Sequence, residues 1–389
     1  MVNSLYRRVS RKRVCLICGK PDWCSYEPEG NISFCARVTA NADRISKTGW
    51  GIFYHHSADL FRLPRQSHFP VARSRVFSLA SNKVRDFVYR KLIEFAPATL
   101  SPEIVSGPKG LASRNILDFE NYGSLPQSRV ERDDIASRIE DRLNQNYPGR
   151  VQMPKTGGYG IPGFWMDHCG RTRLWRDRDY STPMMLIPFR DPNGLIQACQ
   201  IRFMGVVATR KHPRYLWLST PEKAGGCSCG TPLHFARYHP NCFETPLLVT
   251  EGALKAETVR KFEKDLDIIG SGGVSCSHDK IILAARFRHL FLAYDHDWAH
   301  NPHVARSIAR LLYCRILDEQ NRHYSRTVKI LFWNSRAKGI DDALLGNAPI
   351  SQLTVFEWLD ALTTACRHEV ESYFEQSGKS IKNVFIRGE

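Results

Sequence analysis

The sequence lacks an apolar run long enough to cross a membrane and lacks the glycine-rich loop of P-loop proteins. No stretch reaches the roughly 18–20 apolar residues that a transmembrane helix needs, so we expect no membrane partner. Residues 1–14 carry five arginines or lysines but no apolar segment, which argues against a secretory signal. We therefore expect a cytoplasmic protein whose twelve cysteines are free thiols or metal ligands rather than disulfides.

Acidic residues are in short supply. The chain has 39 Asp and Glu against 55 Lys and Arg, which gives a formal net charge of +16. Such an excess favours a polyanionic partner, and nucleic acid is the commonest one. The 389 residues and the hydrophobic content of 42% are enough for two or three domains with buried cores.

Four of the cysteines form a compact motif near the N-terminus. Cys15, Cys18, Cys24 and Cys35 follow the pattern C-x2-C-x5-C-x10-C. Four thiolates at such spacing are typical of a tetrahedral structural zinc site, which has no open position for catalysis. His55 or His56 is an alternative for one ligand. Residues 1–56 are therefore predicted to form a zinc-ribbon-like module.

The middle of the chain is basic and divides into a helical part and a strand-rich part. Residues 57–150 begin as a basic linker, and their apolar spacing predicts helices at 82–95 and 131–146. Residues 151–245 are basic, and the glycines and prolines between 157 and 163 break helices. Strands are expected there at 184–189 and 195–203, joined by a D-P-N-G turn. Cys227, Cys229 and Cys242 have poor spacing for a second zinc site, so we favour a loop with free thiols.

Residues 246–347 alternate between strands and helices, which predicts β-α-β units and a parallel sheet. Strands are expected at 247–250, 266–269, 290–294 and 328–332, and helices at 252–262, 279–288 and 301–317. The tail, residues 348–389, is predicted to hold one helix over 351–375. Its apolar face is expected to pack on the body of the protein, with docking of a partner protein as the alternative. The fold class is thus multidomain α/β, with an α+β middle region.

Acidic residues stand where three of these strands end. Glu251 directly follows the first strand, and Asp295 and Asp297 follow the third. Ligands of open parallel sheets bind beyond the carboxyl ends of the strands, and three carboxylates there would repel one another without a cation between them. Oxygen ligands of this kind suit Mg²⁺ or Mn²⁺. Asp341 adds a fourth acid after the last strand, and glycines 270, 272 and 273 allow close approach of a ligand.

The pair Glu251-Gly252 and the triplet Asp295-His296-Asp297 resemble the signature of the TOPRIM domain. DnaG-type primases, topoisomerases and some nucleases share this domain. The stretches LLVTEGALKAE, GSGGVS, FLAYDHDWAHNPHVARSIARLL and KGIDDALL are similar to a subfamily of phage and plasmid replication proteins. Upstream, LIPFRDPNGLIQACQIRF and PRYLWLSTPEK resemble the strand-rich part of a primase polymerase domain, and CLICGKPDWCSYEPEGNISFCAR resembles its zinc module. These parts follow one another in primase order.

The resemblance implies a DNA primase that makes short primers on a single-stranded DNA template from nucleoside triphosphates. It implies structural Zn²⁺, and catalytic Mg²⁺ or Mn²⁺ held by Glu251, Asp295 and Asp297. Asp341 is the candidate for a second metal ion, and a replicative helicase is a candidate partner in trans. Contacts to template or nucleotide are expected from Arg190, Arg202, Arg214, Tyr215, Lys255, Gly272 and Gly273.

Two departures from the family pattern leave alternatives open. Lys255 stands where DnaG-type primases carry an acid, and Gly339 replaces the first acid of their D-P-D-E run. The number of catalytic metal ions is therefore undecided. A TOPRIM nuclease, which would direct a metal-bound water at a phosphodiester, has the same core acids. A zinc-bearing DNA-binding replication factor without catalysis is the third reading.

If nucleic acid is the main partner, affinity for single-stranded DNA will fall by about tenfold or more between about 50 and 200 mM salt, because bound counterions are released from the phosphates. Fluorescence anisotropy with a labelled oligonucleotide measures this. A response that is flat with salt would exclude nucleic acid as the main partner.

Overall fold

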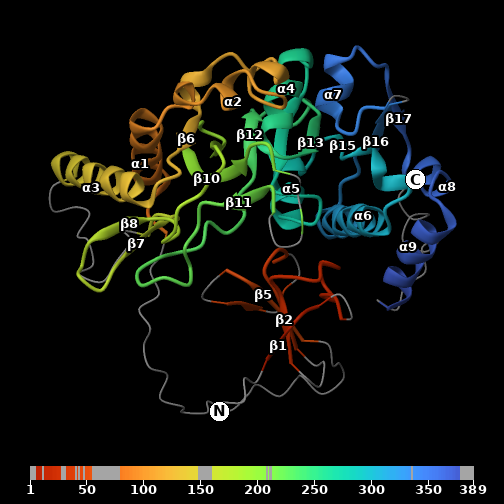
Figure 1. The fold of residues 1–389 in the computed structure, drawn as a ribbon. Helices are drawn as coiled ribbons and strands as arrows, with labels where there is room; N and C mark the ends of the chain where they lie inside the picture. Colours follow the sequence, from red (N-terminus) through yellow and green to blue (C-terminus); the bar gives the residue numbers. More distant parts are fainter. Residues whose placement is uncertain are drawn as a thin grey trace. The chain divides into compact units, whose positions relative to one another are not determined.

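The computed structural model describes residues 6–10, 13–27, 32–39, 42, 44–46, 49–54, 79–147, 160–206, 209, 213–333 and 336–376. The chain divides into two compact units, Met1–Ser78 and Leu79–Glu389, and each is described here by itself (Figure 1). The alternative zinc ligands His55 and His56 and most of the basic linker lie outside the described residues. Within the described part of the chain, no helix has the length and apolarity to cross a membrane.

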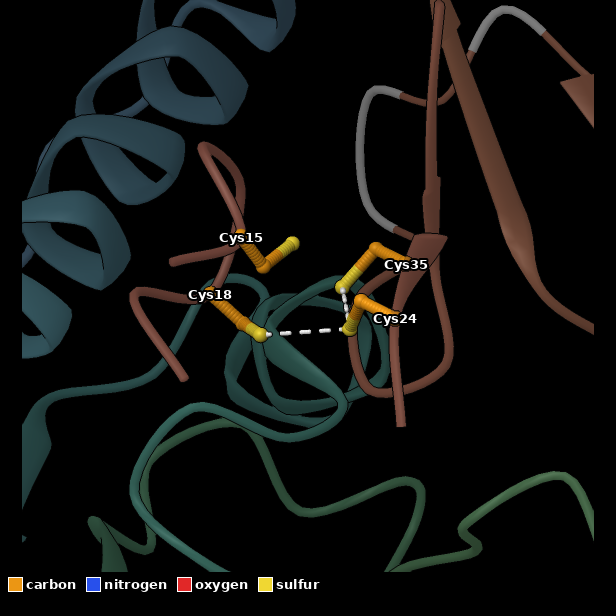
Figure 2. Close-up of side chains that lie close together, drawn as sticks. All are labelled: Cys15, Cys18, Cys24 and Cys35. Atoms are coloured by element: carbon orange, nitrogen blue, oxygen red, sulfur yellow. Dashed lines mark hydrogen bonds between the residues drawn. The ribbon is translucent and has the colours of Figure 1, made fainter. Parts of the chain in front are cut away.

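The first unit is a small antiparallel sheet in the order β1-β2-β3-β5-β4. Its strands are β1 (Arg7–Arg8), β2 (Ser25–Tyr26), β3 (Ile32–Cys35), β4 (Arg44–Ile45) and β5 (Gly51–Tyr54). Among the described residues of this unit, the buried hydrophobic side chains are those of Val9, Val38 and Phe53 together with cysteines 15, 18, 24 and 35. The four cysteines lie close together in Figure 2. A core this small needs a covalent or metal staple to be stable.

The first half of the second unit packs two helices on a four-stranded sheet of order β11-β10-β9-β6. The helices are α1 (Asn82–Phe95) and α3 (Arg129–Asn146), and the strands are β6 (Gly123–Leu125), β9 (Met184–Arg190), β10 (Ile196–Phe203) and β11 (Tyr215–Trp217). A hairpin, β7 (Phe164–Met166) with β8 (Thr172–Leu174), packs on α3. The D-P-N-G turn is confirmed, since Asp191 Oδ1 accepts hydrogen bonds from the backbone N–H groups of Asn193 and Leu195.

Short helical segments join α1 to β6 and form part of the contact with the second half. They are η1 (Ala98–Leu100), α2 (Pro102–Val105), η2 (Ala112–Arg114) and η3 (Phe119–Asn121). Ile104 and Leu111 from this segment share a hydrophobic cluster with Ile187 of β9 and with Ala253 and Leu254 of the second half. The segment between residues 96 and 122 therefore packs beside α4 (Ala253–Phe262) of the second half, although the two are far apart in sequence.

The second half is built on a six-stranded sheet of order β12-β14-β13-β15-β16-β17. Its strands are β12 (His234–Arg237), β13 (Leu247–Glu251), β14 (Asp267–Ser271), β15 (Leu290–Ala293), β16 (Val328–Trp333) and β17 (Ile350–Leu353). The four central strands are parallel, as predicted, and the two edge strands are antiparallel. The two edge strands, β12 and β17, were not predicted from the sequence.

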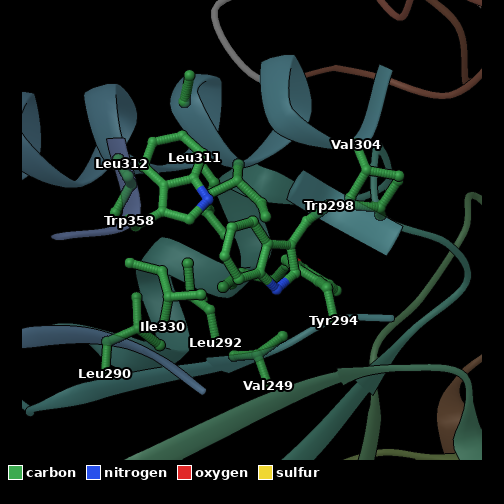
Figure 3. Close-up of a cluster of buried hydrophobic side chains, with 14 of the residues drawn as sticks. Val249, Leu290, Leu292, Tyr294, Trp298, Val304, Leu311, Leu312, Ile330 and Trp358 are labelled. Carbon is green, nitrogen blue, oxygen red and sulfur yellow. The ribbon is translucent and has the colours of Figure 1, made fainter. Parts of the chain in front are cut away.

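Helices cover both faces of this sheet because its strands are apolar on both sides. The helices are α4 (Ala253–Phe262), α5 (His278–Ala285), α6 (Pro302–Arg322) and α7 (Ile340–Leu345). Val249 and Leu292 point to a cluster shared with α5 and α6, and Leu248 and Ala293 point to one shared with α4 and α7. Figure 3 shows the first cluster, with strand residues facing Leu311 and Leu312 of α6 and Trp358.

A buried histidine links the two halves of the second unit. His234 of β12 accepts a hydrogen bond at Nδ1 from the backbone N–H of Arg190, 3.1 Å away, in β9. Its Nε2 therefore carries the proton and donates to Glu257 of α4 at 2.9 Å. Burial would raise the pKa of Glu257, but the hydrogen bonds from His234 and Arg260 lower it to about 2, so the carboxylate is ionised.

The single tail helix predicted over 351–375 is wrong. The chain instead forms β17, α8 (Val355–Asp360) and α9 (Thr364–Gln376). Thr354 begins α8 with a capping box, in which its hydroxyl accepts from the Glu357 N–H and its own N–H donates to the Glu357 carboxylate. The expected packing on the body does occur, since Leu359, Cys366 and Val370 are buried against the sheet and α6.

Replacing Thr354 with alanine should lower the free energy of unfolding by about 1 kcal/mol, because the cap hydroxyl is lost. Chemical denaturation followed by tryptophan fluorescence measures this, since Trp358 lies on α8. Ser351→Ala, at an exposed position of β17, is the matched control and should be nearly neutral. Equal losses in the two variants would contradict a capping role.

Candidate functional site

The four predicted zinc ligands come together in the first unit. Their sulfur atoms all lie within 4.8 Å of one another and all four residues are buried. Sγ of Cys24 is 3.6 Å from Sγ of Cys18 and 3.9 Å from Sγ of Cys35 (Figure 2). Cys15 and Cys18 sit on a tight turn, in which the N–H of Gly19 donates to the Cys15 carbonyl at 2.8 Å. Gly19 has a φ of 68°, which favours glycine at that place.

Donors around this cluster suit anionic sulfur. The backbone N–H groups of Ala36 and Val38 point to Sγ of Cys24 and Cys35 at 3.4 and 3.3 Å, and the Arg37 guanidinium reaches Cys18 and Cys24 at 3.9 Å. Cys15 lowers the pKa of the Cys18 thiol through a side-chain hydrogen bond. The cluster therefore fits structural zinc bound by four thiolates.

Across the described residues, no second group of three or more His, Cys, Asp or Glu ligand atoms lies this close together. Burial raises the pKa of Cys227 to about 12 and that of Cys229 to about 11, while Cys242 is exposed. The interpretation of these cysteines as free thiols agrees with this. It also follows that the acidic residues do not form a ready-made metal cluster.

The acidic residues nevertheless stand at one edge of the parallel sheet. Glu251 is the last residue of β13, and Thr250 pairs with Ala293 of the neighbouring strand β15. Asp295 and Asp297 follow β15 at the short turn η4 (His296–Ala299). Asp341 lies in the first turn of α7, after β16. Three adjacent strands thus deliver carboxylates to the same edge.

Lysine ammonium groups sit among these carboxylates. Lys255 on the first turn of α4 forms an ion pair with Asp295, and Lys338 lies 3.4 Å from an Asp295 oxygen and 3.8 Å from an Asp297 oxygen. Burial lowers the pKa of Lys255, but Asp295, Glu251 and Asp341 outweigh it and raise the pKa overall. The repulsion expected among the acids is therefore relieved by side-chain cations.

Asp341 is the most deeply buried of these acids, with a side chain 1% exposed. One of its oxygens pairs with Arg114, and among the described residues the other, Oδ1, has no hydrogen-bond partner. The neighbouring Asp342 is contacted by Lys109 at 3.2 Å. Neither Arg114 nor Lys109 was predicted as a site residue. Both come from the 57–150 region, more than 220 residues before their partners, and no local sequence pattern marks them.

Glycines allow close packing around the acids. A Cβ on Gly273 would lie 3.9 Å from Oε1 of Glu251, and one on Gly272 would lie 2.7 Å from the Trp217 ring. A Cβ on Gly339 would lie 2.9 Å from Cε of Lys255 and would also meet Oδ1 of Asp341. The glycine loop predicted to approach a ligand therefore lies beside Glu251. Gly339, which stands where the family pattern has an acid, packs against Lys255 instead.

The remaining predicted contacts divide into two groups. Arg202 is buried, donates to the Lys109 carbonyl at 2.8 Å and lies 5.7 Å from the Tyr215 ring centre. Tyr215 and Arg214 are exposed. Arg190 instead donates within its own turn to the Gly194 carbonyl and to Asn121. Arg202, which lies near the Tyr215 ring, therefore contacts the backbone of Lys109, whose side chain pairs with Asp342. Arg190 instead stabilises the β9–β10 turn.

Comparison with known proteins gives likenesses of structure only. No known protein family and no curated protein matches the chain. A primase of Aquifex aeolicus, solved with its zinc-binding and RNA polymerase domains, is 13% identical and covers 79% of this chain and 76% of its own, with a TM-score of 0.44. A DNA primase domain from Pseudomonas aeruginosa is 16% identical, with coverages of 77% and 98% and a TM-score of 0.44. A DnaG primase catalytic domain bound to single-stranded DNA is 16% identical, with coverages of 79% and 98% and a TM-score of 0.42.

All three TM-scores are below 0.5 and all three identities below 25%, so the function is inferred below from the residues of this chain. The mixed α/β fold and the N-terminal four-cysteine module are confirmed by the structure itself.

The purified chain should contain one zinc ion, and Cys24→Ser should lose most of it, because a three-thiolate site binds zinc far more weakly. Metal analysis by mass spectrometry measures the content. Cys242→Ser, at an exposed cysteine outside the cluster, is the control and should keep its zinc. Equal zinc in the two variants would contradict the four-cysteine assignment.

Proposed function

We propose that this chain is a DNA primase, a metal-dependent nucleotidyltransferase that makes short primers on single-stranded DNA. The observation that carries the proposal is the delivery of Glu251, Asp295 and Asp341 by three adjacent strands to the carboxyl edge of the parallel sheet, beside a glycine loop. The net charge of +16 and the four-cysteine module support a nucleic acid partner.

The donor set fits Mg²⁺ or Mn²⁺. The site offers hard oxygen ligands, and within the described residues Oδ1 of Asp297 is buried without a hydrogen-bond partner. Glu251, Asp295 and Asp297 would hold the ion. When bound, it would reduce the negative charge of the triphosphate and polarise the phosphorus under attack.

The side chains of this chain then have distinct tasks. Lys338 is 67% exposed and so can leave its carboxylates to bind a phosphate oxygen of the incoming nucleotide. The alternative task for Glu251, in place of metal binding, is to accept the proton of the attacking 3′-hydroxyl. Loop residues Gly272 and Gly273 present backbone to the triphosphate without a side chain in the way.

Contacts with the template are assigned to the strand-rich half. Tyr215 is 39% exposed and offers a ring on which a base can stack. Arg202 orients that ring from beneath, and Arg214 is available for backbone phosphates. The zinc module is a further candidate for contact with the single-stranded template.

The finer assignments belong to the same proposal. We infer that the parallel core is a TOPRIM domain over 246–347, preceded by the module at 1–56, the linker region at 57–150 and the strand-rich part at 151–245, and followed by the tail at 348–389. The substrates are nucleoside triphosphates, and the reaction takes place in the cytoplasm. Replication of a phage or plasmid, with a helicase in trans, is the setting that the resemblance favours.

Primer synthesis tests the proposal directly. With single-stranded DNA, nucleoside triphosphates and Mg²⁺ or Mn²⁺, the protein should produce short oligonucleotides. Asp295→Ala and Asp297→Ala should lower the rate by about a hundredfold or more, because each removes a ligand of the metal ion. Asp360→Ala, at a 78% exposed side chain of α8, is the control and should keep full activity.

Other products would identify the competing readings. Metal-dependent cutting of the template without synthesis would make the protein a nuclease. DNA binding with neither reaction would leave a non-catalytic replication factor.

A further inference from the structure

A lysine occupies the centre of the acidic site. Lys255 forms an ion pair with Asp295, and its Nζ is 3.1 Å from the place of a Cβ on Gly339. Oδ1 of Asp341 touches that same place, so the ammonium lies between carboxylates of two different segments. Glu251 acts on it from a third segment, the end of β13. One ammonium thus faces the acids of three neighbouring strands.

The absence of a side chain at Gly339 provides the space that Lys255 occupies. Any side chain at position 339 would meet Cε of Lys255 at 2.9 Å and would also meet the Asp341 carboxylate. The unpartnered Oδ1 of Asp341, in a side chain 1% exposed, faces this space. A buried carboxylate oxygen without a hydrogen bond is costly unless a cation is near it, and Lys255 supplies that cation.

The two lysines of the site differ in burial. The Lys255 side chain is 20% exposed, while that of Lys338 is 67% exposed. Water screens the charge of Lys338 and its long side chain moves freely, so its ion pairs are weak. The charge of Lys255 is screened much less, and a divalent ion a few ångströms away would be repelled by it.

We propose that Lys255 is a resident cation that stands where a second divalent ion would otherwise bind, so that the site takes one divalent ion, on the side of Asp295 and Asp297. The inference deepens the proposed function and rests on it for the reaction at this site. It gives Asp341 the task of holding Lys255, together with Arg114, instead of a metal ion. In the reaction, the ammonium would neutralise phosphate charge from a fixed position.

Manganese binding without nucleotide or template tests the inference. Electron paramagnetic resonance on the full-length, zinc-loaded protein should count one Mn²⁺ ion per chain, lost in Asp295→Asn. Lys255→Gln should bind a second Mn²⁺ and should bind the first about tenfold more tightly, because a weakly screened positive charge is gone. Lys255→Arg keeps the charge and should behave as the wild type does.

Lys338→Gln is the matched control, since it removes an exposed lysine from the same carboxylates and should change manganese affinity by less than about threefold. Unchanged manganese binding in Lys255→Gln, or an equal change in Lys338→Gln, would overturn the inference. If Lys255→Gln does not fold, the wild type still tests the inference. Two Mn²⁺ ions bound to the wild type, both lost in Asp295→Asn, would overturn the proposal of a single divalent ion.

The two proposals fail in different ways. If Lys255→Gln gains manganese but the wild type makes no primers, the proposed function is wrong and the role of Lys255 stands. If the wild type makes primers and Lys255→Gln binds manganese as the wild type does, only the role of Lys255 is wrong.

Discussion

Electrostatic compensation at the edge of the parallel sheet is the constraint on which the site depends. Glu251, Asp295 and Asp341 are delivered there by three adjacent strands, and carboxylates so placed repel one another unless positive charge lies between them. Lys255 supplies that charge from the first turn of α4, and Lys338 and Arg114 add theirs from the loop before α7 and from η2. The fold can therefore hold its acids together before any metal ion or nucleotide arrives.

This arrangement explains why the middle region of the chain belongs to the site. The segment before β6 packs its apolar residues on α4, and this packing carries Lys109 and Arg114 to the acidic edge. Arg202 then donates to the Lys109 carbonyl, which connects the strand-rich half to the same place. The four-stranded sheet and α4, which covers the parallel sheet, thereby share one hydrophobic cluster.

Much of the core could be predicted from the sequence because its signals are local. Apolar runs such as Leu247–Thr250 mark buried strands, and an acid directly after such a run must lie at the carboxyl edge of a parallel sheet. The spacing of the four N-terminal cysteines similarly predicts the zinc site. Arg114 and Lys109 were missed because their partners lie far along the chain. The close packing of Lys255 against Gly339 could not be predicted from the sequence either, because it depends on space that another side chain fills. The tail was mispredicted because one apolar stripe continues through two helices. The Thr354 cap separates β17 from α8, and only the turn before Thr364 separates α8 from α9.

The hydrogen bonds of His234 fix how the two halves of the second unit are oriented. Because its ring joins β9, β12 and α4 and is fully enclosed, the strand-rich half and the parallel sheet are set at one orientation when the chain folds. The entropic cost of aligning the two sheets is then met once, during folding. Such preorganisation fixes the surfaces of both sheets relative to each other before any ligand arrives.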